Sequence, residues 1–351
     1  MATDPGSSGG GRQDRKKMTQ DSTVHSVLWM RVLSGIQPSG QLHLGNYFSM
    51  MRQMIHYQDR EELFCFVASY HALTTVFEKE KLEEGIRNAV LDFLALGMDP
   101  DRSTFWVQSD VPEVAELSWL LSTSITVPQL ELGHSYKDKI AQGISPSGGL
   151  FFYPILMAAD ILAFGGEKVP VGKDQKQHLE FTRDIAGRFN NRYGEVFVIP
   201  EPEIGKEVAV VPGVDGRKMS KSYGNAIYFF APEKKLRKTV MGIVTDSTGV
   251  DEAKDPENSV LYQIYCLFLN EEERQELAQR FRTPGTGYGH FKQELFERIM
   301  ETFADARKKR EEMAADPGFL KDVMRKGSEK ARAIASQYLD RAREAVGLKY
   351  L

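Results

Sequence analysis

The sequence predicts an α/β protein with a doubly wound parallel sheet and a second, all-helical region behind it. From residue 31 to residue 121, short apolar runs alternate with segments whose apolar residues recur at helical spacing. One run, residues 63–68, is apolar throughout, as in a strand buried on both faces. Beyond about residue 231 the patterns are helical. This alternation predicts parallel strands joined by helices, followed by a separate helical region.

Each element follows from a local pattern of apolar residues and chain breakers. Strands are expected at residues 31–33, 63–68, 104–108, 168–171, 195–199 and 208–211. Helices of the sheet region are expected at residues 47–57, 79–96, 112–121, 150–164 and 175–189. Later helices are expected at residues 234–243, 259–268, 271–281, 288–309 and 319–346. In such sheets ligands bind beyond the carboxyl ends of the strands, so the site is expected there.

Shifts in composition divide the chain into a tail and two domains. Residues 1–29 combine glycine, serine and basic residues without an apolar period, which predicts a disordered tail. Residues 30–230 form the predicted sheet domain, with an insertion at about 122–149 and a Gly/Pro-rich loop at 212–225. Residues 231–351 form the predicted helical domain.

Composition and charge exclude several classes of protein. The 351 residues are 41% hydrophobic and 27% charged, which is ordinary for a globular protein. The net charge of −4 gives no general basic field, so nucleic acid would have to meet local patches. No apolar run approaches the roughly 18 residues that span a bilayer, so no membrane is expected. Two cysteines, Cys65 and Cys266, are too few for a zinc site and predict a reducing, cytoplasmic setting.

The segment at residues 34–46 is the first candidate for a binding site. It reads Ser-Gly-Ile-Gln-Pro-Ser-Gly-Gln-Leu-His-Leu-Gly-Asn and lies between an apolar strand pattern and a helical pattern. A strand–turn–helix of this kind leaves backbone N–H groups free at the start of the helix, where an anionic phosphate can bind. His43 and Asn46 add neutral polar side chains. Alone, the segment predicts only a turn that suits phosphate.

The segment at residues 216–222, Gly-Arg-Lys-Met-Ser-Lys-Ser, supplies a counterpart in the later Gly/Pro-rich loop. Two ammonium groups on a mobile loop can close on a polyphosphate and balance charge on leaving pyrophosphate. A Lys-x-x-Lys alone is ordinarily a solvated basic loop. The string Lys-Met-Ser-Lys-Ser downstream of a turn with His-x-Gly is more specific. Together the two strings resemble the signatures of class I aminoacyl-tRNA synthetases.

Further strings narrow this resemblance. Ser-Gly-Ile-Gln-Pro-Ser-Gly (34–40), Met-Ala-Ala-Asp-Ile-Leu (157–162), Val-Pro-Val-Gly (169–172) and Asp-Gln-Lys-Gln-His (174–178) look like tryptophanyl-tRNA synthetases of the bacterial type. The similarity is dense up to residue 225 and diffuse afterwards. The resemblance implies a Rossmann-like catalytic domain and a helical domain that binds the tRNA anticodon. It also implies a homodimer.

The resemblance implies which residues hold ATP. The catalytic residues would be His43, Lys218 and Lys221. The nucleotide site would consist of Gln37, Pro38, Ser39, Gly45, Asn46, Lys139, Gly172, Lys173, Asp174, Val210, Lys218, Met219, Ser220, Lys221 and Ser222. The string His-Leu-Gly-Asn ends in Asn46, and an asparagine cannot titrate. Its role would therefore be placement, and the chemistry would rest on positioning and charge stabilisation.

The resemblance also implies a tryptophan site, made of Asp160, Tyr153, Met157, Gln175, Val169 and Val171. Asp160 lies in an otherwise apolar helical pattern, with Tyr153 and Met157 on the same face. A carboxylate there could accept the hydrogen bond of the indole N–H, which is a donor only. The alternative is that Asp160 pairs with a buried lysine or arginine. Tyr153 and Met157 could equally be core residues.

Three polar positions near strand ends carry more than one interpretation. Asp174 is a candidate helix N-cap, with Gln177 three residues later, as well as a site residue of the family. Lys173 stands where the family usually has an acidic residue, which puts the contact role of residues 172–174 in doubt. Lys139 matches a lysine that touches pyrophosphate in the family, or it is an exposed surface lysine.

The expected cofactors and partners follow from the same resemblance. ATP would bring Mg²⁺ held mainly by its own phosphates. The other partners would be L-tryptophan and tRNA(Trp), with residues 234–238 and 307–310 as basic candidates for the anticodon contact. Some relatives bind an iron–sulfur cluster, but two cysteines exclude one here.

Three other functions fit parts of the sequence. A tyrosyl-tRNA synthetase shares the fold and both signatures, although the strings at 157–162 and 174–178 speak against it. A nucleotidylyltransferase without tRNA would lack a use for the long helical region. A non-catalytic or accessory paralogue with an extra binding role is the third alternative, and the intact Lys218 and Lys221 argue against loss of catalysis.

Overall fold

The computed structural model describes residues 29–38, 40–141, 143, 145–171, 176–204 and 210–350. At positions 134, 135, 139, 171, 176 and 204 it describes the backbone alone. Of the predicted tail, only the last residue, Trp29, lies within the described residues.

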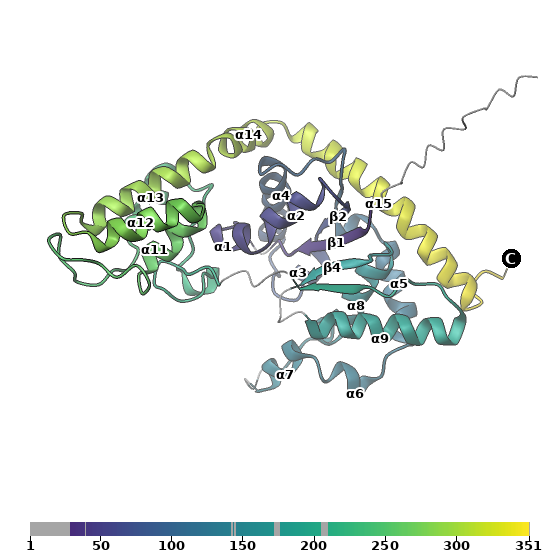
Figure 1. Ribbon diagram of the computed structural model, residues 1–351. Helices are drawn as coiled ribbons and strands as arrows, with labels where there is room; N and C mark the ends of the chain where they lie inside the picture. The colour runs from purple at the N-terminus through teal and green to yellow at the C-terminus, as the bar shows by residue number, and fades with distance from the viewer. Residues whose placement is uncertain are drawn as a thin grey trace, which may run out of the picture.

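The centre of the fold is a five-stranded sheet in the order β3-β2-β1-β4-β5, with all neighbours parallel (Figure 1). The strands are β1 (Arg31–Ile36), β2 (Glu62–Val67), β3 (Thr104–Val107), β4 (Lys168–Val171) and β5 (Glu201–Ile204). The predicted doubly wound parallel sheet is confirmed. From β1 the chain continues to β2 and β3 on one side of the sheet, and from β4 it continues to β5 on the other side. The strand order therefore reverses between β1 and β4. Their carboxyl ends are the place where such sheets bind ligands.

Helices cover both faces of the sheet. Helix α1 (Leu44–Asn46) continues through a π-helical turn (Tyr47–Met51) into α2 (Arg52–Tyr57), so the helix begins earlier than predicted. The other helices of the sheet region are α3 (Ser69–Ala72), α4 (Lys79–Ala95), α5 (Glu113–Ser122), α8 (Gly148–Leu162) and α9 (Lys176–Tyr193). Alternate residues of a strand face opposite sides of the sheet. Val32 and Cys65 lie in the core that contains α2 and α4. Leu33 and Phe64 lie in the core that contains α5, α8 and α9.

The strand predicted at residues 195–199 is wrong, and β5 lies just after it. The side chain of Asn190 on α9 replaces the sheet ladder in this segment. Its Oδ1 accepts from the backbone N–H groups of Val196 (3.1 Å) and Phe197 (3.0 Å), and its Nδ2 donates to the Phe197 carbonyl (2.8 Å). Of the strand predicted at 208–211, residues 208 and 209 lie outside the described residues, and residues 210–211 are not in a strand.

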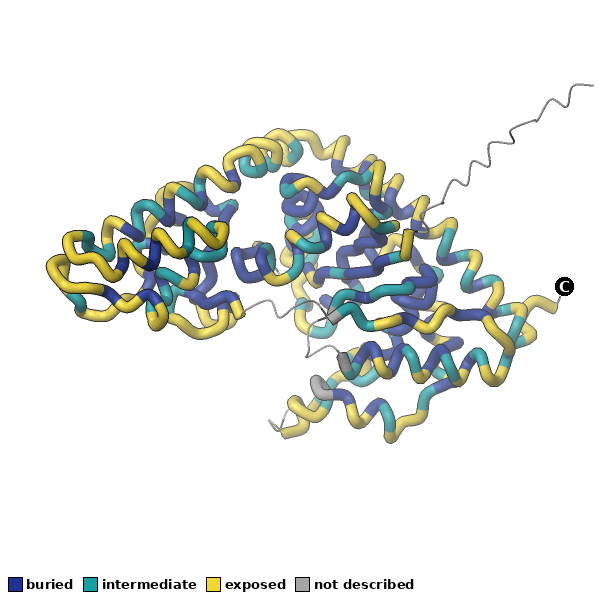
Figure 2. Tube along the Cα trace, viewed as in Figure 1, coloured by how far each residue is buried: buried dark blue, intermediate teal, exposed yellow. Residues whose placement is uncertain are grey.

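The predicted insertion at 122–149 contains two short helices, α6 (Val127–Leu130) and α7 (His134–Ala141). Both lie below α9 in Figure 1, away from the sheet. In Figure 2 this part of the chain is mainly exposed, whereas the strands are mainly buried.

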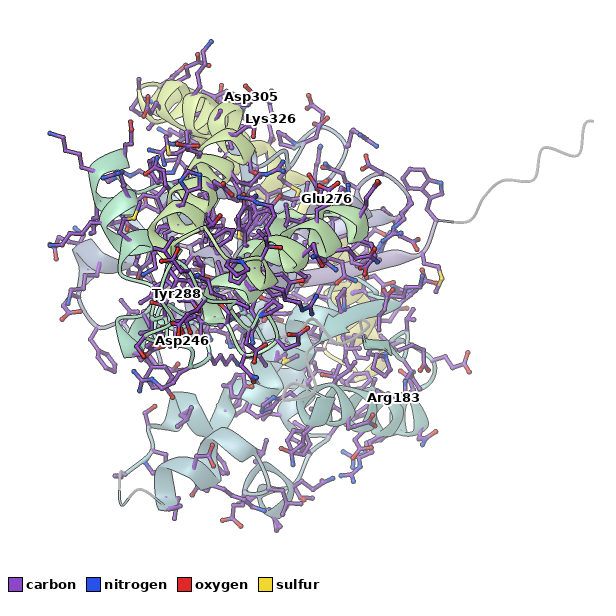
Figure 3. The ribbon with its side chains drawn as sticks, turned by 60° about the vertical axis from the view of Figure 1, so that its left-hand side comes forward. Arg183, Asp246, Glu276, Tyr288, Asp305 and Lys326 are labelled. Carbon is purple, nitrogen blue, oxygen red and sulfur yellow. The ribbon has the colours of Figure 1, made fainter. Side chains whose placement is uncertain are left out.

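The region after the sheet is helical, as predicted. It consists of α10 (Glu233–Met241), α11 (Val260–Tyr265), α12 (Glu271–Arg282), α13 (Tyr288–Thr302), α14 (Ala304–Ala314) and α15 (Pro317–Ala345). The single helix expected at 288–309 is broken at Phe303, whose ring stacks on that of Phe229 at 4.6 Å between centroids. At the start of α13 the Tyr288 hydroxyl donates to Asp246 Oδ1 at 2.9 Å, and Figure 3 shows these two side chains together.

Helix α15 returns to the sheet domain, so the predicted helical domain does not run to the C-terminus as one unit. In Figure 1 it extends along the sheet region, far from α11–α13. Gly327 sits against strand β3, because a Cβ there would lie 1.7 Å from the Phe105 carbonyl oxygen. Ala331 and Ala335 belong to the same buried core as Leu33 and Phe64. Small residues on one helix face permit this close approach. Within the described residues, no helix is long and apolar enough to cross a membrane.

Candidate active site

The turn after β1 lies at the carboxyl edge of the sheet, where the topology predicts a site. Gly40 has φ of +104°, which favours glycine, and Pro38 before it is buried. Helix α4 packs directly under this turn, since a Cβ on Gly85 would lie 2.3 Å from the Pro38 carbonyl oxygen. The turn is therefore supported by a close backbone contact that the sequence reading did not identify.

His43 is held at the end of this turn as a neutral imidazole. It is 6% exposed, and its backbone N–H donates to Asn46 Oδ1 at 3.1 Å. Burial, followed by the nearby charge of Lys221, lowers the pKa of His43 to about 4. Gly45 leaves room for the ring, because a Cβ at that position would lie 2.9 Å from His43 Nδ1. At neutral pH His43 can donate a hydrogen bond but carries no charge.

The first N–H groups of α1 are not free, contrary to the expectation from the sequence. The Leu44 N–H donates to the Ile227 carbonyl at 2.9 Å, and the Gly45 N–H points to Met219 Sδ at 3.2 Å. Both acceptors come from the lysine loop, residues 212–225, or the segment just after it. The two predicted halves of the nucleotide site are thus in direct contact here.

Asn225 fixes the shape of the lysine loop. Its Oδ1 accepts from the Ser220 N–H (2.8 Å), and its Nδ2 donates to the Lys218 carbonyl (3.1 Å) and to Asp215 Oδ1 (2.7 Å). Asn225 is 2% exposed, and a Cβ on Gly213 would collide with it at 2.3 Å. Sequence reasoning missed this residue, although an asparagine directly after the Gly224 turn was a usable signal.

The two lysines of the loop have different surroundings. The side chain of Lys218 is exposed, and its backbone pairs with that of Pro212 in an isolated antiparallel β-bridge. Lys221 is half-buried, and a Cβ on Gly40 would lie 3.9 Å from its Nζ. Burial lowers the pKa of Lys221 to about 8, and the charge of Asp92 opposes this shift. The Lys221 ammonium therefore lies beside the turn after β1 and is still charged at neutral pH.

Asp160 lies in a second cluster, formed by residues that follow β2 and β3. It is 2% exposed on α8. Gln108 Nε2 donates to both of its oxygens (2.7 and 2.8 Å), and His71 Nε2 lies 2.7 Å from Oδ2. Since a carboxylate only accepts, the His71 ring nitrogen must be the donor. The alternative of a buried lysine or arginine partner is not found among the described residues.

Gln108 is itself fixed, so the position of Asp160 is well determined. Its Oε1 accepts from the backbone N–H groups of Tyr70 (2.9 Å) and His71 (3.4 Å). A carboxylate offers about four acceptor positions, and Gln108 and His71 use three. Among the described residues no other donor reaches Asp160, so one acceptor position is left for a further donor.

Aromatic rings continue this cluster along α8. The ring of Tyr153 contacts His71 edge-on at 5.5 Å and His178 at 4.9 Å between centroids. Met157 is partly buried on the same helix, and Val169 is 4% exposed in the core beside it. His71 thus joins Tyr153 and Asp160 on one side of α8, and Met157 packs against the core that contains Val169.

Other predicted site residues are placed less completely. Gln37 is exposed on the turn after β1, and Val210, just before the lysine loop, is 65% exposed. Ser222 is exposed in a short 3-10 turn whose N-cap is Ser220. Lys139 and Val171 are described by backbone alone. Outside the described residues lie Ser39, Gly172, Lys173, Asp174 and Gln175.

Sequence reasoning missed His71 and Gln108, the two partners of Asp160. Gln108 is the last residue of the predicted strand 104–108 and the first residue after β3, and His71 lies four positions after the end of β2. A search for polar residues at the carboxyl ends of parallel strands would have found them.

The comparisons with known proteins identify the family of the chain. Residues 29–304 match the family described as tRNA synthetases class I (W and Y), so the fold and site define a class I aminoacyl-tRNA synthetase. The tryptophan–tRNA ligases of Fusobacterium nucleatum and Campylobacter jejuni are 54% and 50% identical to the chain over 91% of its length, covering 98% and 100% of their own. The chain belongs to the tryptophan–tRNA ligase family.

A solved structure supports the same assignment. The crystal structure of tryptophanyl-tRNA synthetase from Campylobacter jejuni, complexed with ADP and tryptophan, matches with a TM-score of 0.86 at 50% identity. The match covers 91% of this chain and 100% of that one. The tyrosine enzyme considered from the sequence is therefore not supported, and neither is a nucleotidylyltransferase without tRNA.

Proposed function

We propose that the cluster around Asp160 binds L-tryptophan and that the turn and lysine loop bind ATP, with His43, Lys218 and Lys221 as the catalytic residues. The observation that carries this assignment is the meeting of the turn after β1 with the lysine loop at Gly40 and Lys221. It puts a half-buried ammonium at the carboxyl edge of the sheet, where a phosphate would lie.

In the first step, a tryptophan carboxylate oxygen forms a bond to the α-phosphorus of ATP while the bond to the β-phosphate oxygen breaks. The products are tryptophanyl-adenylate and pyrophosphate. Neutral His43 donates a hydrogen bond to the α-phosphate, and its lowered pKa means that it takes no proton in this step. Lys218 and Lys221 balance the charge that develops on the leaving pyrophosphate.

Mg²⁺ enters with ATP as part of the substrate. The described groups next to the turn are the neutral His43 and the cation Lys221, and the nearby carboxylate of Asp92 already bonds Arg310. The ligands of the ion would therefore be mainly phosphate oxygens and water.

Asp160 recognises the indole. Its remaining acceptor position takes the indole N–H, while Gln108 and His71 hold the carboxylate in place. A side chain without an N–H donor would leave the buried carboxylate short of a partner, which disfavours phenylalanine.

In the second step, a hydroxyl of the tRNA 3′-terminal ribose attacks the tryptophanyl carbonyl and AMP leaves. The helical domain would contact the anticodon, where unstacked bases can be read. The exposed basic face of α10, with Lys234, Lys235 and Lys238, supports this role. In the second predicted cluster Lys308 and Lys309 are exposed, whereas Arg307 and Arg310 bond groups of the chain itself.

A homodimer in the cytoplasm completes the proposal. The dimer is carried over from the resemblance to the synthetase family to which the chain belongs. Sedimentation of the full chain is expected to give twice the chain mass.

The function is tested by ATP–pyrophosphate exchange with each of the twenty amino acids, followed by charging of tRNA(Trp). We expect exchange that depends on tryptophan and charging of tRNA(Trp). Exchange that depends on tyrosine, or exchange without charging, would contradict the proposal.

The surroundings of Lys221 predict a pH dependence of the first step. Its pKa of about 8 means that the ammonium is lost as pH rises through that value, so kcat/KM for ATP should fall above about pH 8. Because the pKa of His43 is about 4, titration of this residue should not change the rate near neutral pH. The measurement is exchange at saturating tryptophan between about pH 7 and pH 10. Lys221→Arg is the control, because a guanidinium stays charged and should remove the alkaline limb.

A further inference from the structure

Asp92 is a buried carboxylate outside the substrate contacts described above. It lies in the apolar C-terminal half of α4 and is 2% exposed. A carboxylate buried to this extent needs a charged or hydrogen-bonding partner. Its partners therefore indicate what the residue does.

The first partner is Arg310 of α14, 218 positions away in the sequence. Arg310 Nε donates to Asp92 Oδ1 at 2.6 Å, and Arg310 Nη2 donates to Asn88 Oδ1 at 2.9 Å. Asn88 and Asp92 are one turn apart on α4, so a single guanidinium bonds two positions of that helix. Helix α14 is thereby fixed to the helix that supports the turn after β1.

Helix α14 also bonds the segment that leaves the lysine loop. Arg307, one turn before Arg310, donates through Nη2 to the Ala231 carbonyl at 2.9 Å and through Nη1 to the Phe229 carbonyl. This segment includes Ile227, whose carbonyl accepts from the Leu44 N–H. Two arginines of one helix thus connect α4 with the chain just downstream of Lys221.

The carboxylate of Asp92 also faces the site itself. The backbone N–H of Leu42, in the turn, and the ammonium of Lys221 oppose the effect of burial on its pKa. Burial raises the pKa of Asp92 to about 6 and lowers that of Lys221 to about 8, so both are charged at neutral pH. Among the described residues, the charged groups that act on Asp92 are Arg310 from α14 and Lys221 from the loop, and the titratable group of the turn that is coupled to Lys221 is His43.

We propose that Asp92, held by Arg310, is a positioning residue that sets the place and charge of Lys221 for ATP activation. This inference rests on the proposed catalytic role of Lys221. Asp92 acts through Lys221 and through the turn, without touching substrate. Because Arg310 lies on α14, which directly follows α13 in the helical region, the position of that region is linked to the ATP site through the ion pair of Arg310 and Asp92.

The activity test compares Asp92→Asn, Arg310→Met and Arg310→Lys in tryptophan-dependent exchange. We expect kcat to fall about tenfold in the first two variants with KM for tryptophan unchanged, and Arg310→Lys to recover part of the loss. Arg332→Met is the matched control, since Arg332 of α15 forms an ion pair with Glu113 of α5 at 2.9 Å, away from the lysine loop. It should leave kcat unchanged. A lower melting temperature with wild-type kcat in Arg310→Met would make the pair merely structural and overturn the proposal.

A second readout does not depend on the reaction. The pKa of Lys221 is measured on the full chain from the pH dependence of its acetylation by acetic anhydride, followed by mass spectrometry. Asp92→Asn should lower this pKa, because it removes the opposing negative charge. Arg310→Met should lower it as well, because Asp92 without its guanidinium partner takes up a proton more readily and loses the charge that acts on Lys221. An unchanged Lys221 pKa in Arg310→Met overturns the inference, even if Asp92→Asn does not fold. Absence of tryptophan-dependent exchange in the wild type would contradict the proposed function instead.

Discussion

Replacing Lys221 with alanine is expected to lower the kcat of tryptophan-dependent ATP–pyrophosphate exchange by about 10²–10³-fold. The Lys221 ammonium lies beside Gly40 in partly buried surroundings, where an interaction with a developing phosphate charge is stronger than in water. Lys218 is exposed, so its alanine variant should lose less. The measurement is kcat and KM for ATP at saturating tryptophan.

The control for Lys221→Ala is Lys235→Ala, which removes a lysine from the exposed face of α10. This control should leave kcat near the wild-type value and should affect only steps that involve tRNA. If the two alanine variants have the same exchange kinetics, Lys221 has no special role in activation. Thermal unfolding of both variants checks that the lysine loop remains folded.

Asp160→Asn is expected to lower kcat/KM for tryptophan by about 10²–10³-fold, with KM for ATP little changed. The asparagine keeps the size of the side chain but turns one acceptor into a donor. That donor would face Gln108 Nε2 or His71 Nε2, both of which already donate to this position. The cluster loses both its charge and the acceptor for the indole.

Asp184→Asn, on the exposed side of α9, is the control for removing one carboxylate from the chain. It should retain wild-type kinetics for tryptophan and ATP. Wild-type tryptophan kinetics in Asp160→Asn would mean that Asp160 only holds His71 and Gln108 in the core.

The parts of the fold that were predictable are those with a strong local signal. The continuous apolar run at 63–68 predicted β2, and the pattern at 168–171 predicted the bounds of β4. Strand β5 (Glu201–Ile204) has the sequence Glu-Pro-Glu-Ile and no such signal, whereas the apolar residues 195–199 before it predicted a strand wrongly. There the competing interaction was the Asn190 side chain, which bonds the backbone of Val196 and Phe197. The return of α15 to β3 depends on Gly327, whose close contact is visible only in three dimensions.

The candidate site likewise consists of parts that have a strong local signal in the sequence and parts that have none. The turn and the lysine loop are contiguous strings of glycine, histidine and lysine, so the sequence predicted them. The residues that fix them come from distant positions: His71 is 89 positions from Asp160, and Arg310 is 218 from Asp92. No local pattern reports such a pair. Asn46 was predicted to serve placement of the nucleotide, which stays a prediction, and its Oδ1 accepts from the His43 N–H at the start of α1.

The central claim is that the carboxylate of Asp160 selects tryptophan by accepting the indole N–H. The most direct test compares tryptophan with β-(3-benzothienyl)alanine, which has nearly the same shape but sulfur in place of the N–H. We expect wild-type kcat/KM in ATP–pyrophosphate exchange to favour tryptophan by about 10²–10³-fold, and Asp160→Asn to lose most of that preference. Equal use of the two amino acids by the wild-type chain would contradict the account.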